Sequence, residues 1–353
     1  MKICLIIYGS LDTLSGGYLY DRKLVEYLRS QEDTVDILSL PWRNYAAHLT
    51  DNFNFRLPRD LDIIIQDELN HPSLLFANRG KHAYPIISLV HHLRCSELRP
   101  NWQNAFYREI EKTYLRSVDG FIFNSKTTEK VVSSLIRSDK PSIIAYPPTD
   151  RFGEPISGEE IISRASISPL RILFLGNVIE RKGLLTLLEA VKDLRSNVNI
   201  DIVGSLSSEP GYTRQIQEYM SVNNLSSSIF LHGSLDKQPL IEKLKQAHVL
   251  VVPSSYEGFG IVYLEGMCFG LPAIGTMAGA AGEIISDGVD GFLIEPGDVN
   301  LLASRLKVLN ENREVLIQMS LAARERYLRQ PKWEETASGI REFLLKQIRD
   351  FSV

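Results

Sequence analysis

Two glutamates stand eight residues apart in the stretch PSSYEGFGIVYLEGMCFGLP, which runs from Pro253 to Pro272. Glu257 lies in a loop bracketed by glycines, and Glu265 lies in what the apolar pattern predicts to be a helix. The spacing leaves three interpretations open. The two carboxylates could perform acid/base chemistry, grip two ends of one elongated ligand, or be ordinary helix charges.

The glycines around Phe259 favour the second interpretation. Gly258 and Gly260 let the backbone approach a ligand closely, and the helix start near Ile261 can receive an anion. A nucleoside diphosphate-sugar laid across this turn would place its phosphates at the helix start. Its ribose would then lie toward Glu265, about one turn into the helix, and its sugar toward Glu257. For either glutamate taken singly, the alternative is a structural role, as a charge that caps the helix or as an exposed charge on the helix.

Two cations occur in a similar position earlier in the chain. A predicted strand ends at Gly176, and Arg181 and Lys182 come just before a predicted helix that begins near Gly183. Two positive charges beside orphan helix N–H groups make a site for a diphosphate. The alternative is a pair of solvated surface charges.

A third stretch, GSLDTLSGGY (9–18), lies between a predicted strand and a predicted helix. Gly16 and Gly17 could bring bare backbone N–H groups against an anion. The stretch is neither G-x-G-x-x-G nor a Walker loop, because no Lys-Ser/Thr follows. A flexible turn between a strand and a helix is the alternative.

The elements that must position these residues form two series. Short apolar runs alternate with amphipathic stretches in each series, which predicts α/β domains with doubly wound, Rossmann-like parallel sheets. A mixed stretch rich in proline and glycine separates the series. We therefore predict a first domain over 1–150, a linker over 151–169 and a second domain over 170–331. A ligand cleft is expected where the carboxyl ends of the two sheets face each other.

Bulk composition agrees with a globular chain of two domains. The chain has 353 residues, 44% of them hydrophobic, and a net charge of -4 that argues against nucleic acid as a partner. Cys4, Cys95 and Cys268 are far apart and lack zinc or redox spacing, which favours a reducing, cytoplasmic location. The apolar run at 3–8 is too short for a signal peptide and predicts a buried first strand. No window of 18 apolar residues predicts a membrane span.

The stretch SSYEGFGIVYLEGMCFGLPAIGT closely resembles the signature of glycosyltransferase family 4. That pattern is Glu-Gly-Phe-Gly, four residues, Glu, a small residue, Met, and then Gly-x-Pro. Other segments follow in the family's order: SGGY, LVHH, FNS (123–125), GNVIERKGLLTLLEA, HGSLDKQPL, GEIISDGVDGFLIEPGD and PKWEETASGIREFLL. The resemblance covers nearly the whole chain. It implies the GT-B fold, with the last helix (332–353) crossing back onto the first domain.

The resemblance also implies a set of residue roles. Glu257 would hold hydroxyls of the donor sugar, Glu265 the ribose, and Lys182, helped by Arg181, the departing diphosphate. His91 would lie near the transferred sugar; a packed core histidine is the alternative. The remaining donor-binding positions implied are Gly16, Gly17, Gly176, Asn177, Gly233, Leu235, Gly258, Phe259, Gly260 and Ile261.

Two departures from the family pattern concern the donor. The family often has Arg after the glycine at 176, where this chain has Asn177, so the phosphate charge would fall on Arg181 and Lys182. The stretch GTMAGAAGEI has no polar sugar-reading residue before Glu283. The donor's base and sugar therefore stay open.

The resemblance implies a retaining glycosyltransferase of the hexosyltransferase type. Its donor would be a nucleoside diphosphate-sugar, and its acceptor a saccharide or a lipid-linked sugar. No Asp-rich motif or His cluster is visible in the sequence, so we expect no metal and no other cofactor. A nucleotide-sugar epimerase of the same fold and a non-catalytic nucleotide-sugar-binding protein are the alternatives.

A basic segment suggests a further partner. Residues 79–116 hold seven basic side chains against three acidic ones, and Trp102, Phe106 and Ile110 recur at four-residue spacing. Such an element could make a peripheral contact with anionic lipid at the inner face of the membrane. The alternative is a helix whose apolar stripe packs on the core while its charges point outward.

Overall fold

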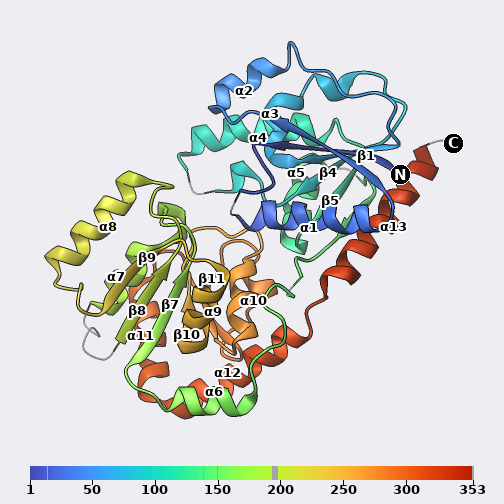
Figure 1. Ribbon diagram of the computed structural model, residues 1–353. Helices are drawn as coiled ribbons and strands as arrows, with labels where there is room; N and C mark the ends of the chain where they lie inside the picture. The colour runs from blue at the N-terminus through green and yellow to red at the C-terminus, as the bar shows by residue number, and fades with distance from the viewer. Residues whose placement is uncertain (14, 98, 138, 149, 193–197, 352–353) are drawn as a thin grey trace. The chain divides into compact units, whose positions relative to one another are not determined.

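The chain divides into two compact units in the computed structural model (Figure 1). Unit 1 comprises Met1–Pro148 and Pro331–Val353, and unit 2 comprises Thr149–Gln330. The structure describes residues 1–351 apart from 14, 98, 138, 149 and 193–197. Leu14 of the predicted glycine loop and residues 352–353 of the predicted last helix therefore lie outside the described residues.

Unit 1 is built on a parallel sheet of six strands in the order β2-β1-β3-β4-β5-β6. The order reverses between β1 and β3, which are neighbours in the sheet. The strands are β1 (Lys2–Tyr8), β2 (Thr34–Leu40), β3 (Ile63–Asp67), β4 (Ile86–Val90), β5 (Gly120–Phe123) and β6 (Ser142–Ile144).

Helices cover both faces of this sheet, and the alternation along β1 explains why. Ile3, Leu5 and Ile7 belong to one core cluster, and Cys4 and Ile6 belong to another. A strand whose successive side chains are all apolar must be covered on both sides. The helices are α1 (Gly16–Ser30), α2 (Tyr45–Asp51), α3 (His71–Leu74), α4 (Asn101–Leu115), α5 (Lys126–Ile136) and α13 (Trp333–Phe351), with three short 3-10 turns, η1 (Glu68–Asn70), η2 (Ala77–Arg79) and η3 (Arg94–Ser96).

The last helix, α13, packs against α1 within unit 1 (Figure 1). Trp333 donates its indole N–H to the carbonyl of Lys23 at 2.9 Å. Arg341 donates to the buried carboxylate of Asp33 at 2.7 Å, and the N-terminal amine of Met1 binds the same carboxylate at 2.8 Å. A buried ion pair and an apolar face thus attach the end of the chain to its beginning.

Unit 2 repeats the plan, with six parallel strands in the order β12-β11-β10-β7-β8-β9. The order reverses between β7 and β10, which pair directly. The strands are β7 (Leu170–Leu175), β8 (Val198–Val203), β9 (Ile229–Gly233), β10 (Val249–Val251), β11 (Ala273–Thr276) and β12 (Gly291–Ile294).

The first helix of unit 2 lies in the mixed stretch rich in proline and glycine, where the sequence shows no strand signal. In α6 (Gly158–Ala165), the Ser157 and Glu160 side chains cap each other's backbone N–H groups, which starts a helix despite the nearby prolines and glycines. The others are η4 (Glu180–Lys182), α7 (Leu184–Val191), α8 (Pro210–Val222), α9 (Lys237–Gln246), α10 (Ile261–Cys268), η5 (Ala281–Glu283), α11 (Val299–Glu311) and α12 (Arg313–Leu328).

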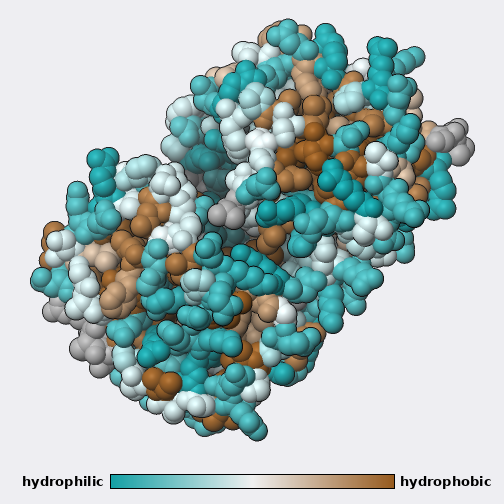
Figure 2. All heavy atoms as spheres, in the orientation of Figure 1, coloured by the Kyte–Doolittle hydropathy of each residue, from teal (hydrophilic) through white to brown (hydrophobic). Residues whose placement is uncertain are grey.

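Two parallel, helix-covered sheets confirm the predicted α/β class. Among the described residues, no helix combines the length and the apolar character that a membrane span requires. On the face drawn in Figure 2, hydrophilic and hydrophobic residues are mixed over both units.

Candidate active site

The predicted donor residues of unit 2 lie where the strand order reverses. Lys182 ends the segment that follows β7, and Glu257 lies in the loop that follows β10. In open parallel sheets, the crevice outside the carboxyl ends of two such strands is the usual ligand site. The topology therefore puts these two segments, 75 residues apart in sequence, next to each other.

Lys182 and Glu257 form a partly buried ion pair. The Lys182 Nζ atom donates to Glu257 Oε2 at 2.7 Å, and each side chain is 12% exposed. Ser254 donates its hydroxyl to the same carboxylate oxygen at 3.0 Å. A lysine ammonium has three N–H donors, so further donors remain for a ligand oxygen.

Arg181 has a second role that the sequence does not reveal. Its Nη1 donates to the carbonyl of Tyr256 at 2.7 Å, and its own carbonyl accepts from the N–H of Ser255 at 2.8 Å. The guanidinium also lies 3.9 Å from Glu257 Oε2. Arg181 therefore shapes the loop that carries Glu257 as well as adding positive charge.

The pKa values follow from this arrangement. Burial alone would raise the pKa of Glu257, but Lys182 and Arg181 outweigh it and hold the pKa below its usual range. Burial lowers the pKa of Lys182, and Glu257 opposes that effect. With one carboxylate and two cations, the cluster has a net charge of +1, which suits a ligand with more than one negative charge.

Gly279 fixes the backbone of the Glu257 loop, and sequence reasoning missed it. Glu257 and Gly279 form an isolated parallel bridge, in which Glu257 N–H donates to Ala278 and Ala280 N–H to Glu257. A Cβ atom on Gly279 would lie 2.1 Å from the Glu257 carbonyl oxygen, and its φ is +90°. The stretch GTMAGAAGEI thus supports the Glu257 loop through its backbone rather than through polar side chains. Its small residues, which allow such close packing, are the signal that could have indicated this role.

Gly260 ends the loop and starts helix α10. Its φ of +91° lies in the left-handed region, and a Cβ would lie 2.6 Å from the Tyr263 ring and 3.1 Å from the Glu257 side chain. Among the described residues, no side chain caps α10, and the Tyr263 N–H donates to the carbonyl of Gly260 at 2.9 Å. The N–H groups of Ile261 and Val262 at the helix start are therefore the ones that geometry offers to an anion. Phe259 is 4% exposed and anchors the turn, with Gly258 before it and Ile261 after it.

Glu265 is only 6% exposed, and it lies in a helix with almost no solvent-facing side. Its carboxylate accepts a hydrogen bond from Arg151, whose side chain is 41% exposed. Burial raises the pKa of Glu265, and Arg151 opposes that rise. Burying a carboxylate whose partner is one half-exposed cation costs folding free energy. Packing of α10 does not require a charged residue at this position, which indicates a functional use for Glu265.

The remaining predicted residues of unit 2 differ in their surroundings. Gly176 lies against the Lys182 side chain, because a Cβ there would be 3.5 Å from Lys182 Cε. Asn177 accepts the N–H of Ser205 and so links two loops. Gly233 accepts the N–H of Gly204, whose missing Cβ allows it to pack on Gly176. Leu235 is partly buried in the turn before α9, with no described contact to the ion pair.

Unit 1 brings two of its three predicted residues together. Gly17 packs on the imidazole of His91: a Cβ on Gly17 would lie 3.3 Å from the ring. Gly16 is the first residue of α1, which Ser15 caps by accepting the N–H of Tyr18. His91 is therefore a partly buried histidine next to the glycine pair. This position agrees both with a histidine near the transferred sugar and with a packed core histidine.

Carboxylates and imidazoles also gather in unit 1 in two groups, one buried and one that is buried except for its partly exposed histidine. Among the described residues, the ligand atoms within each group lie within 4.8 Å of one another. The groups are Asp21, Asp67 and His91, and Glu68, His71 and Glu111. In each, the histidine already faces an acceptor: His91 faces Asp21, and His71 faces the carbonyl of Glu68, both at 3.0 Å. We therefore assign neither group as a metal site.

Residues 161–326 match the family profile described as glycosyl transferases group 1. An uncharacterized glycosyltransferase of Methanocaldococcus jannaschii is 32% identical over 170 residues, which are 48% of this chain and 46% of the relative. A D-inositol 3-phosphate glycosyltransferase of Xylanimonas cellulosilytica is 25% identical over 65% of this chain and 57% of its own length. The chain thus spans about half the length of these curated relatives.

Solved structures of the GT-B type share the fold. A sucrose-phosphate synthase from Thermosynechococcus elongatus matches with a TM-score of 0.82, 19% identity and 99% coverage of both chains. Anabaena HepE, solved in complex with UDP-glucose, matches with a TM-score of 0.76 and 16% identity over 98% of this chain and 100% of HepE.

Proposed function

We propose that this chain is a retaining, metal-independent hexosyltransferase, and the match of residues 161–326 to the glycosyl transferases group 1 profile supports the proposal. The donor is a nucleoside diphosphate-sugar, and the acceptor is a hydroxyl of a saccharide or a lipid-linked sugar. One observation carries the proposal: the Lys182–Glu257 pair lies at the strand-order reversal of unit 2, beside the uncapped start of α10. Three distant segments converge there on one net-positive, partly buried cluster.

The roles follow from the charge that develops during transfer. The bond between the anomeric carbon and the phosphate oxygen breaks, and negative charge accumulates on the diphosphate. Lys182, Arg181 and the first-turn N–H groups of α10 stabilise that charge. Glu257 accepts hydrogen bonds from the sugar hydroxyls, Glu265 binds the ribose, and His91 faces the transferred sugar.

Retention follows from attack on the face that the leaving group occupies. The acceptor oxygen bonds to the anomeric carbon, and its proton passes to an oxygen of the departing phosphate. Glu257 is already bound by Lys182 and Ser254, so we do not assign it as a covalent nucleophile. NMR of the first product would reject this course if the anomeric configuration were inverted.

A thermal-shift panel of nucleoside diphosphates and their sugars tests the function directly. The structural neighbour HepE was solved with UDP and with UDP-glucose, so uridine compounds head the panel. A ligand at 100 times its Kd adds about 2.7 kcal/mol of stability, which is easily detected. The proposal fails if no nucleoside diphosphate or nucleotide sugar raises the Tm, or if a binder supports no transfer to any acceptor.

We expect transfer to be independent of added metal. The positive charges at the diphosphate site come from side chains and helix N–H groups, which supply what a divalent cation would otherwise supply. Protein treated with EDTA and then desalted should therefore keep its full rate. Loss of transfer on EDTA treatment, with recovery on adding magnesium or manganese, would contradict this expectation.

We also propose a peripheral contact between unit 1 and anionic lipid. The apolar stripe on α4 is not a core face in its first two turns, because Trp102 is 72% and Phe106 51% exposed. Aromatic side chains beside basic ones suit a lipid headgroup region. The chain should therefore sediment with anionic vesicles at low salt and be released at high salt.

A matched variant makes the vesicle experiment specific. Trp102→Ser with Phe106→Ser removes two exposed rings and no charge, so it should weaken sedimentation while leaving the fold intact. Absence of sedimentation of the unaltered chain at low salt would rule out the contact.

A further inference from the structure

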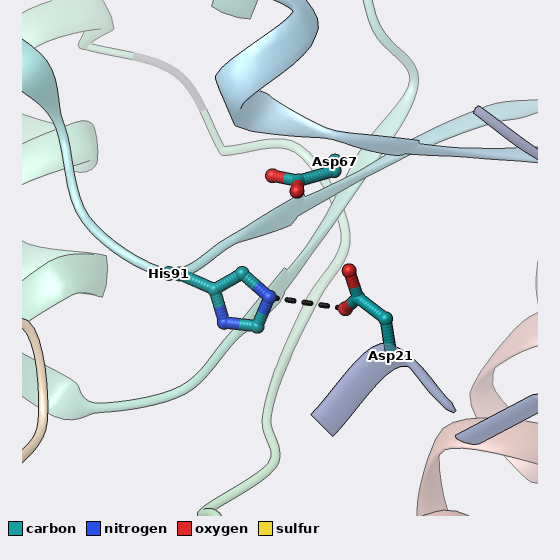
Figure 3. A group of neighbouring side chains, drawn as sticks. All are labelled: Asp21, Asp67 and His91. Atoms are coloured by element: carbon teal, nitrogen blue, oxygen red, sulfur yellow. Dashed lines mark hydrogen bonds and ion pairs between the residues drawn. The ribbon is translucent and has the colours of Figure 1, made fainter. Parts of the chain in front are cut away.

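A partly buried histidine and two buried carboxylates meet at the carboxyl ends of the strands of unit 1 (Figure 3). His91 follows β4, Asp67 ends β3, and Asp21 projects from α1. Nε2 of His91 lies 3.0 Å from Asp21 Oδ1, and the polar atoms of all three groups lie within 4.8 Å of one another. The cluster lies beside the reversal of strand order between β1 and β3, where parallel sheets bind ligands.

The His91 ring is held in one orientation from several sides. Gly17 lies against the ring, since a Cβ there would be 3.3 Å from it, and the Tyr20 ring meets it in a T-shaped arrangement with centroids 5.4 Å apart. Asn124 donates to the His91 carbonyl at 2.7 Å, which fixes the backbone. The second ring nitrogen, Nδ1, points away from both carboxylates (Figure 3) and has no described protein partner. The side chain is 16% exposed, so part of the ring is accessible to a ligand.

We propose that Asp21 is a positioning residue: it accepts the Nε2–H of His91 and so presents Nδ1 to the substrate, with Asp67 as a second carboxylate beside the ring. Nothing in the sequence motifs points to Asp21, and no assigned role uses it. Its second oxygen, Oδ2, is buried and has no hydrogen-bond partner within the described part of the chain, so it is an uncompensated acceptor beside the ring. The proposal deepens the glycosyltransferase function proposed above and rests on it.

Charged and titratable groups lie around His91 on several elements. Asp21 lies on α1, Asp67 at the end of β3, Glu68 on η1, and His92, bound to Glu97, in its own loop. Burial alone would lower the pKa of His91, but Asp21 and then Asp67 raise it to about 9. Burial and the Asp21 charge raise the pKa of Asp67 to about 6, and burial raises that of Glu68 to about 8. At neutral pH the ring is thus cationic, and it loses its Nδ1 proton as the pH rises through about 9.

A histidine titration by NMR tests the arrangement without any activity assay. The chain has seven histidines, and His91→Gln identifies the His91 signal by deleting it. His91 should titrate well above the ordinary value of about 6.5. In Asp21→Asn its pKa should fall by about one unit or more, because an opposite charge at this distance is lost. Asp67→Asn should lower it by a smaller amount.

Asp33→Asn is the matched control. Asp33 is 5% exposed and ion-paired within the same unit, to Arg341 and the N-terminus, so its loss should cost stability without moving the pKa of His91. The alkaline limb of kcat/KM should move down with the His91 pKa in Asp21→Asn and stay unmoved in the control. Nucleoside diphosphate binding should persist in Asp21→Asn, which separates failure of this inference from failure of the proposed function.

Three results would overturn the inference. One is an unchanged His91 pKa in Asp21→Asn, and another is a kcat/KM profile in that variant identical to that of the unaltered chain. The third concerns a metal ion: if micromolar Mn²⁺ broadened the His91 signal and Asp21→Asn abolished the broadening, the cluster would be a cation site. If Asp21→Asn does not fold, the Asp67→Asn titration decides, since Asn can still accept the Leu69 N–H that Asp67 binds.

Discussion

Replacing Lys182 with methionine is expected to lower kcat for sugar transfer by about 10²- to 10³-fold, the loss typical of removing one fixed donor from developing negative charge. Methionine keeps an unbranched stem against Gly176 but removes the ammonium that binds Glu257. Because Glu257 would then be partly buried without its main partner, stability should fall by about 3 kcal/mol. Steady-state kinetics and urea denaturation measure the two effects.

Lys243→Met is the matched control for this experiment. Lys243 also binds a carboxylate within unit 2, Asp201 at 2.8 Å, but that carboxylate lies on β8 and not in the loops that follow β7 and β10. Transfer by this variant should equal that of the unaltered chain. Glu257→Gln combined with Lys182→Met should recover stability, because the buried Glu257 charge is removed together with its main partner, yet stay inactive. Full activity in Lys182→Met would show that this ammonium does not act on the diphosphate.

Replacing Glu265 with glutamine is expected to weaken nucleoside diphosphate binding by about 10- to 100-fold. That range corresponds to the ~1.5–3 kcal/mol of a hydrogen bond made to a charged group. Inorganic pyrophosphate, which has no ribose, should bind the variant and the unaltered chain equally. Titration calorimetry with both ligands separates a lost ribose contact from a general loss of the site.

Asp290→Asn controls for the loss of a buried carboxylate in the same unit. Asp290 is 3% exposed and accepts the N–H of Ser286, a bond that asparagine can also accept. Nucleotide binding by this variant should be unchanged. If Glu265→Gln bound the nucleoside diphosphate as tightly as the unaltered chain, the ribose role of Glu265 would be wrong.

The repeated β-α pattern was sufficient to predict the fold class. Buried parallel strands read as continuous apolar runs, and β1 shows why: its odd and even residues pack into different core clusters. Helix α2 was not predicted, because its start depends on a local bond from the N–H of Ala47 to Asn44 rather than on an apolar stripe.

The candidate site was only partly predictable, for a related reason. Glu257 and Lys182 lie in recognisable loops, whereas their partners come from distant parts of the chain. Gly279 supports Glu257 through its backbone, and Arg151 binds Glu265 across 114 positions. Asp21 lies inside an ordinary amphipathic helix, and only the sheet brings it to His91. These contacts depend on which strands are neighbours in the sheet, and a short sequence motif does not contain that information.

The most direct test of the account is a crystal structure of the chain with a bound nucleoside diphosphate-sugar. We expect the diphosphate within hydrogen-bonding distance of Lys182 Nζ and of the N–H groups that open α10, with a sugar hydroxyl on Glu257. A donor bound elsewhere, with Lys182 and Glu257 still joined and the turn at Gly260 empty, would contradict it.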